Sequence, residues 1–111
     1  MNVSLKVAME GDMSREIVFT LEPLQDGVDS GTWSIQRQSG LAVHPTYGHW
    51  TYADSSGEVW LSENSDVFTG VRVDSDWARS LMGGTTVMGQ GWMQRTSEGD
   101  INVLYSMEAT S

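Results

Sequence analysis

The sequence predicts an all-β fold of about eight antiparallel strands forming a small sandwich or barrel, with at most one short helical turn near residues 75–82. Short segments with apolar residues at every second position recur along the chain, which is the pattern of half-buried strands. Stretches rich in Gly, Asn, Asp and Ser separate these segments at regular spacing. The chain has 111 residues, which fits one domain over residues 1–111.

The first two strands form a predicted hairpin. Residues 3–9 and 15–22 alternate apolar with polar side chains, and the turn-forming residues 10–13 lie between them. Pro23 lacks a backbone donor and therefore ends the second strand. Residues 25–31 have the composition of a loop and form the clearest connector in the chain.

The middle of the chain predicts a third strand and a second hairpin. Residues 32–38 alternate, and the irregular residues 39–48 predict a loop that crosses to another part of the sheet. Residues 48–52 and 58–62 are strand-like and flank the turn-forming residues 54–57. This is the most clearly marked hairpin of the sequence.

Three more strands are predicted, over residues 67–73, 85–95 and 100–108. Gly89 and Gly91 interrupt the second of them. Glycine within a strand favours a bulge or a sharp bend, so we expect this strand to curve around a corner of the sheet structure.

Helix punctuation occurs at one place only. Asp74 or Ser75 has the character of an N-cap, and Gly83 lies just beyond the expected end. Trp77 and Leu81 are four residues apart and share one face of a helix. This short turn is therefore expected to plug one end of the sheet structure.

The charge of the chain disfavours direct binding to nucleic acid. Fifteen acidic residues against six basic ones give a net charge of −9, which opposes contact with phosphate backbones. The acids are scattered singly, as expected of a well-solvated surface or an adaptation to salt. A nucleic-acid mimic that binds a basic protein is the alternative explanation.

The sequence predicts a cytoplasmic or virion location and no membrane association. It contains no cysteine, so neither disulfides nor thiolate metal sites are available. The first ten residues lack the apolar run of a signal peptide, and no segment approaches the ~20 apolar residues that cross a bilayer.

No catalytic signature, metal site or cofactor motif is found. His44 and His49 lack a third ligand at a recognised spacing, and the acidic turns lack the ligand ladder of a calcium loop. There is no Gly-x-Ser-x-Gly elbow, and Gly89-x-Gly91 has no helix or lysine beside it to form a phosphate cradle. The sequence therefore favours a non-catalytic protein, although a hidden triad stays open.

Aromatic residues are the candidate binding residues. The chain has five tryptophans, more than the core of so small a sheet protein needs. Trp60 falls on the strand face opposite Val59 and Leu61, so at least one ring is expected outside the core. Such a ring is typical of a partner interface or a ligand cavity. The predicted binding residues are Trp33, Trp50, Tyr52, Trp60 and Trp92.

One short resemblance accompanies this pattern. Thr85-Thr86, Gly89-Gln90 and Ile101-Asn102 resemble the spacing of two adjacent strands in the avidin family of biotin-binding barrels, and Gly31-Thr32-Trp33 is similar to that family's opening strand. Val87 stands where the family has tryptophan, and the family's later strand is missing. No biotin-contacting residue is therefore assigned to this chain.

The leading functional hypothesis is a non-catalytic module that binds a protein partner or self-associates, for example as a structural component of a virus particle. Surplus aromatics and seven adaptable methionines favour it. One alternative is a small-molecule-binding barrel, with or without enzymatic activity, whose cavity is lined by Trp33, Trp50, Tyr52 and Trp92. The other is the acidic nucleic-acid mimic.

Overall fold

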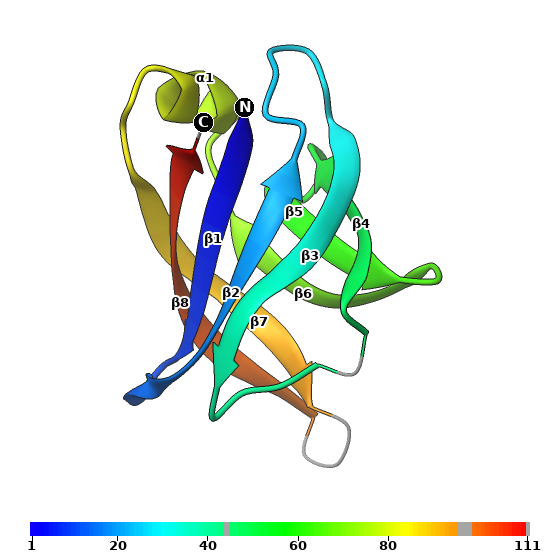
Figure 1. The fold of residues 1–111 in the computed structure, drawn as a ribbon, viewed down its shortest axis with the longest axis vertical. Coiled ribbons are helices and arrows are strands. Elements are labelled where there is room, and N and C mark those ends of the chain that lie inside the picture. The colour runs from blue at the N-terminus through cyan, green and yellow to red at the C-terminus, as the bar shows by residue number, and fades with distance from the viewer. Residues whose placement is uncertain (44, 96–98, 111) are drawn as a thin grey trace.

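The structure is a computed structural model that describes residues 1–43, 45–95 and 99–110. Eight antiparallel strands form a closed barrel in sequence order, which confirms the predicted all-β class and decides between sandwich and barrel (Figure 1). One short helix lies between the sixth and seventh strands. The elements are β1 (Asn2–Met9), β2 (Asp12–Glu22), β3 (Ser30–Ser39), β4 (Tyr47–Ala53), β5 (Glu58–Glu63), β6 (Asp66–Arg72), α1 (Trp77–Met82), β7 (Val87–Arg95) and β8 (Gly99–Thr110).

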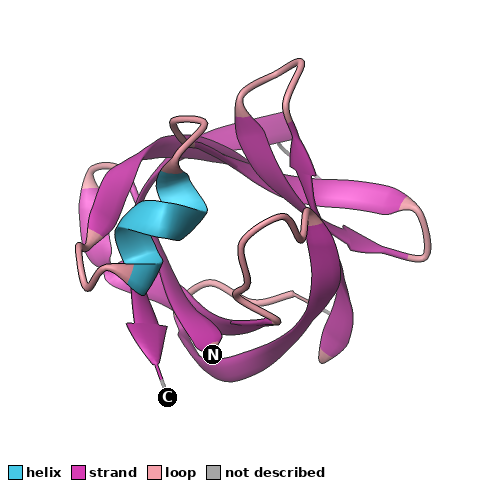
Figure 2. Cartoon of the chain, turned by 90° about the horizontal axis from the view of Figure 1, so that it is seen from above, coloured by secondary structure: helices cyan, strands magenta, loops and turns pink. Residues whose placement is uncertain are grey.

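The barrel closes where the first strand meets the last. β1 pairs with β8 over the whole of its length, from Asn2 opposite Thr110 to Met9 opposite Val103. Both chain ends therefore lie at the same end of the barrel, close to α1 (Figures 1 and 2). Since every strand has a neighbour on each side, the sheet has no free edge.

The barrel interior is filled by the inward members of each alternating strand. Phe19 and Trp33 meet edge to face with ring centroids 5.4 Å apart, and Trp33 meets Phe68 at 5.3 Å in the same manner. Aliphatic side chains surround these rings. The largest fully buried ones are Leu5, Ile17, Leu21, Leu61, Leu81, Met107, Val3, Val7, Val59 and Val71.

The two tryptophans of the barrel interior, Trp33 and Trp50, each lie opposite a glycine on the neighbouring strand. Trp33 pairs with Gly48, and its indole N–H donates to the carbonyl oxygen of Ser62 at 3.0 Å. A Cβ on Gly48 would lie 2.6 Å from the indole nitrogen. Trp50 pairs with Gly31 in the same way, and a Cβ there would lie 2.5 Å from its indole nitrogen. Glycine at these positions lets a large ring lie across the neighbouring strand.

Helix α1 covers the end of the barrel where the chain termini lie (Figure 2). Trp77 and Leu81 are 4% and 0% exposed, so the prediction that their shared face is buried is confirmed. The ring of Trp77 meets that of Trp50 edge to face at 5.9 Å. Asp76 occupies the N-cap position instead of Asp74 or Ser75, and its side chain makes no capping hydrogen bond. No helix of the described part of the chain is long and apolar enough to cross a membrane.

Two details differ from the sequence-based expectation. Residues 39–48 were expected to cross the sheet, but β3 and β4 are neighbours, so this segment joins adjacent strands. β7 carries no bulge against β8, since the register runs unbroken from Val87 opposite Met107 onward. A Cβ on Gly91 would collide with the backbone oxygen of Gly70. Glycine there allows β6 and β7 to approach closely.

Replacement of Gly48 by alanine tests the tryptophan–glycine packing. The new methyl group would collide with the Trp33 indole and the Ser62 carbonyl, so Gly48→Ala should lower the free energy of unfolding by about 1–3 kcal/mol in urea denaturation. Ser34→Ala, at an exposed site on the adjacent strand, should change it by less than about 0.5 kcal/mol. Equal effects of the two substitutions would contradict this account.

Tyr105 should make the barrel sensitive to alkali. Burial, assisted by the charge of Asp74, raises the pKa of Tyr105 to about 12 from 10.0, and its hydroxyl donates to the Arg72 carbonyl. The folded state therefore favours the neutral phenol. The contribution of the neutral Tyr105 phenol to the free energy of unfolding is complete below pH 10. This contribution, about 2–3 kcal/mol in total, is lost as the pH rises from 10 to 12. Denaturant unfolding should show this loss in the parent and in exposed-site Tyr47→Phe but not in Tyr105→Phe.

Candidate functional site

The five predicted aromatic residues fall into three environments. Trp33 and Trp50 are 1% and 2% exposed and belong to the barrel interior. Tyr52 is partly exposed and lies beside Trp77 at the end of the barrel that α1 covers, with ring centroids 6.0 Å apart. Trp60 and Trp92 lie on the outer wall. The structure therefore does not bring Trp33, Trp50, Tyr52 and Trp92 together around one cavity.

The outward direction of the last two tryptophans follows from strand alternation. Trp60 lies between Val59 and Leu61, both of which are fully buried, so its side chain is on the other face, as predicted. Trp92 precedes the buried Met93 and lies outside for the same reason. The paired register places Trp60 and Trp92 on either side of Gly70, across β5, β6 and β7.

A single carboxylate fixes both outer indoles. The Oε1 atom of Glu58 accepts the indole N–H of Trp60 at 2.7 Å and that of Trp92 at 3.3 Å. A Cβ on Gly70 would lie 2.7 Å from the Trp92 nitrogen and 3.0 Å from Cδ1 of Trp60. The pyrrole edges of both rings therefore meet over Gly70, and the carboxylate restricts how either ring can rotate.

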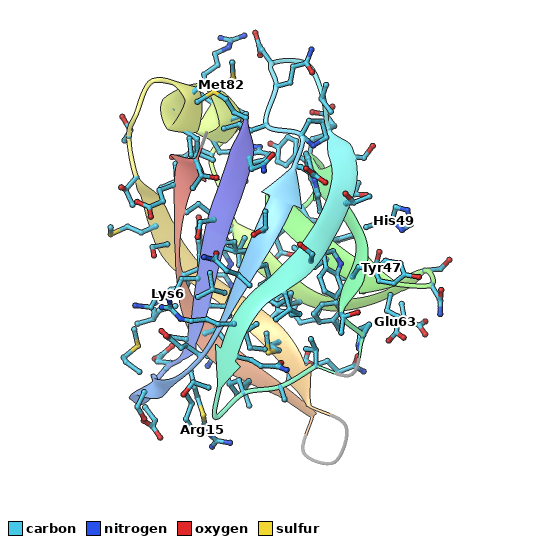
Figure 3. The ribbon with its side chains drawn as sticks, viewed as in Figure 1. Lys6, Arg15, Tyr47, His49, Glu63 and Met82 are labelled. Atoms are coloured by element: carbon cyan, nitrogen blue, oxygen red, sulfur yellow. The ribbon has the colours of Figure 1, made fainter. Side chains whose placement is uncertain are left out.

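Tyr47 and His49 extend this surface along β4. Tyr47 is 75% exposed, the most exposed large apolar side chain in the described part of the chain. Figure 3 shows Tyr47, His49 and Glu63 on the same side of the barrel, directed away from it. Thr51 pairs with Trp60 and joins β4 to the row. We call this set the outer aromatic face: Tyr47, His49, Thr51, Glu58, Trp60, Gly70 and Trp92.

The outer wall over β1 to β3, which is opposite β5 to β7 in strand order, is different. Glu16 forms ion pairs with Arg37 at 3.1 Å and with Lys6 at 3.4 Å. The hydrogen bond from Arg37, with the nearby charge of Lys6, holds the pKa of Glu16 below its usual value despite partial desolvation. Glu16, Lys6 and Arg37 on this wall are thus paired with one another within the chain, and this ion-pair cluster distinguishes the wall from the outer aromatic face.

A cavity of about 230 Å³ lies at the α1 end of the barrel, between the β2–β3 loop and α1. We call it the mouth cavity. The backbone N–H of Tyr52 donates to the carbonyl oxygen of Asp29 at 2.7 Å, which holds the loop against β4. The residues that line the mouth cavity are Asp26, Gly27, Val28, Asp29, Tyr52, Ser75, Asp76, Trp77, Ala78 and Arg79.

Within residues 1–43, 45–95 and 99–110, no three His, Cys, Asp or Glu side chains come close enough to hold a metal ion. His49 lies on the outer wall. His44, the other histidine that the sequence analysis considered as a ligand, lies outside the described residues, as does most of the turn predicted at 96–99.

Five members of the outer aromatic face were not among the predicted binding residues: Tyr47, His49, Thr51, Glu58 and Gly70. Tyr47 lies an odd number of residues from Trp50, so alternation alone places it on the outside when Trp50 is inside. Glu58 has no such signal, because its contact with Trp92 spans 34 positions of the sequence. Only the three-dimensional pairing of β5, β6 and β7 brings these two residues together.

Comparison of the chain with protein-family models, curated proteins and solved structures gives no match. As binding residues, Trp33, Trp50, Tyr52, Trp60 and Trp92 stay predictions, to be weighed on geometry. Trp60, Trp92 and Tyr52 are partly exposed and therefore accessible to a partner. Trp33 and Trp50 are buried and pack in the barrel interior.

Removal of the Glu58 carboxylate should release both outer indoles. In Glu58→Ala the indole N–H signals of Trp60 and Trp92 should move in the NMR spectrum and exchange faster with solvent, while that of buried Trp33 stays in place. The free energy of unfolding should fall by about 1 kcal/mol, since two partly exposed hydrogen bonds are lost. Glu63→Ala serves as the matched control and should move neither signal. Unchanged Trp60 and Trp92 signals in Glu58→Ala would contradict the shared contact.

Proposed function

We propose that this protein is a non-catalytic binding module whose outer aromatic face docks onto a basic protein partner. The observation that carries the proposal is the pair of outer tryptophans held over Gly70 by one carboxylate. Neither ring is needed to fill the barrel, because both lie on its outer wall.

The chemistry of the face suits protein recognition. Tryptophan and tyrosine dominate the energetic centres of protein interfaces, because they bury a large area at a small cost in conformational entropy. The shared contact with Glu58 orders the two indoles before binding, which reduces that cost further. Tyr47 adds a third ring that is largely exposed to solvent.

Charge favours a basic partner over a second copy of the chain. The net charge of −9 makes two copies repel each other, and the turn between β5 and β6 adds exposed acids at Glu63 and Asp66 beside the face. A partner with Lys or Arg around an apolar centre complements both the rings and this acidic rim.

Selection from a library of random peptides displayed on phage tests the proposal. Peptides enriched on the parent protein should contain Lys or Arg together with an apolar or aromatic residue, and their affinity should fall as salt rises. Trp60→Ala and Trp92→Ala should each weaken a selected peptide by about tenfold or more in calorimetric titration. Met13→Ala, which removes another exposed apolar side chain at the far end of the barrel, should leave the affinity unchanged.

The other outcomes of this experiment distinguish the competing functions. Peptide binding that is indifferent to Trp60 and Trp92 would refute the proposed face. A dimer in light scattering that dissociates in Trp60→Ala would replace the basic partner by a second copy. If duplex DNA displaces the protein from a basic DNA-binding protein, and carboxylates away from the face control the affinity, the nucleic-acid mimic is correct instead.

A further inference from the structure

The mouth cavity combines unbalanced negative charge with an aromatic wall. Three of its lining residues are aspartates, namely Asp26, Asp29 and Asp76, and Arg79 is its one cation. Arg79 pairs with Asp26 at 3.6 Å through side chains that are 76% and 63% exposed. The carboxylates of Asp29 and Asp76 have no ion pair within the described residues. The cavity is therefore electronegative.

A separate observation concerns the ring of Trp77. The other four tryptophans each donate their indole N–H to an oxygen, whereas that of Trp77 has no hydrogen-bond partner among the described residues. No side-chain nitrogen or oxygen sealed from solvent in this part of the chain lacks a partner, so this N–H is within reach of solvent. Trp77 is only 4% exposed and is one of the lining residues of the mouth cavity. A largely buried ring with an unpartnered N–H donor therefore forms part of the cavity wall.

From these two observations we infer that the mouth cavity binds a small organic cation, an alkylammonium or guanidinium compound that also carries a hydrogen-bond-accepting oxygen. The cationic group lies between Asp29 and Asp76, and the oxygen accepts the indole N–H of Trp77. The ring of Tyr52 contributes a further attraction for the cation. The volume of about 230 Å³ lies below the ~300 Å³ at which pockets for drug-sized ligands begin, which restricts the ligand to a small molecule or one side chain.

Two sources supply this chemistry. A free amino alcohol carries an ammonium group and a hydroxyl, and a Lys or Arg residue of a polypeptide carries a cation and a backbone carbonyl. The mouth cavity shares no residue with the outer aromatic face, so either site can fail without the other.

NMR titration of the indole N–H signals tests the inference. The signal of Trp77 is identified by its loss in Trp77→Phe, and the probes are ethanolamine, N-acetyl-arginine amide and N-acetyl-lysine amide. At least one probe should move the Trp77 signal saturably in the millimolar range while the Trp33 signal stays in place. Saturation by ethanolamine alone assigns the site to free amines, and saturation by the blocked amino acids assigns it to a polypeptide side chain.

Substitutions of the acids complete the test. Asp29→Asn and Asp76→Asn should each weaken binding about threefold to tenfold, and added salt should do the same. Asp76→Asn preserves the start of α1, because the Asp76 side chain makes no capping bond and asparagine is itself a good N-cap. Asp66→Asn removes an exposed acid at the opposite end of the barrel and should have no effect.

Two results would overturn the inference. One is the absence of a saturable Trp77 shift with all three probes in a protein whose thermal unfolding is normal. The other is an equal shift with N-acetyl-norleucine amide, which has a similar chain length and no charge.

Discussion

The pairing of tryptophan with glycine across neighbouring strands is the interaction on which the rest of this barrel depends. A glycine leaves its part of the sheet uncovered, and an indole from the next strand fills that space while its N–H reaches an oxygen beyond. Inside the barrel, the pairing allows two indole rings to pack at strand contacts where a Cβ in place of glycine would collide with the ring and with a backbone oxygen. Outside, it fixes two more rings on the wall. The pairs are Trp33 with Gly48, Trp50 with Gly31, and both Trp60 and Trp92 with Gly70.

Closure of the sheet explains why some of these rings are available to a partner. A barrel of eight strands has one interior, which its inward side chains fill, and an outward residue cannot reach that interior without breaking the register. The outer tryptophans therefore remain at the surface however apolar they are. Their surplus is a property of the topology and not of an incompletely packed core.

The strands could be predicted from the sequence because half-burial leaves a period of two. The same alternating pattern is expected of a sandwich and of a barrel. The two folds differ in whether β1 pairs with β8, and a contact between segments so far apart in the sequence leaves no local pattern. The glycines of β7 have a related explanation. Glycine within a strand favours a bulge or a bend, but β7 has no bulge against β8, and Gly91 instead allows the backbone of the neighbouring strand β6 to approach closely.

For the candidate site, the sequence supplied residue types and the fold supplied their partners. The outward position of Trp60 follows from strand alternation, because its neighbours Val59 and Leu61 are both buried. The same alternation places Trp92 outside, next to the buried Met93, so the predicted cavity that included Trp92 was wrong. The shared contact through Glu58 and the mouth cavity depend on strand register and loop conformation, which sequence spacing does not contain.

The pairing of Asn2 with Thr110 has a practical consequence. A short linker could join the two ends, and the ring of strands could then be reopened at another hairpin, such as the turn at residues 54–57, to give a circular permutant with the same wall. An affinity tag or fluorescent fusion attached next to Asn2 or Thr110 would stand beside α1 (Figure 1) and leave the strands around Gly70 unobstructed.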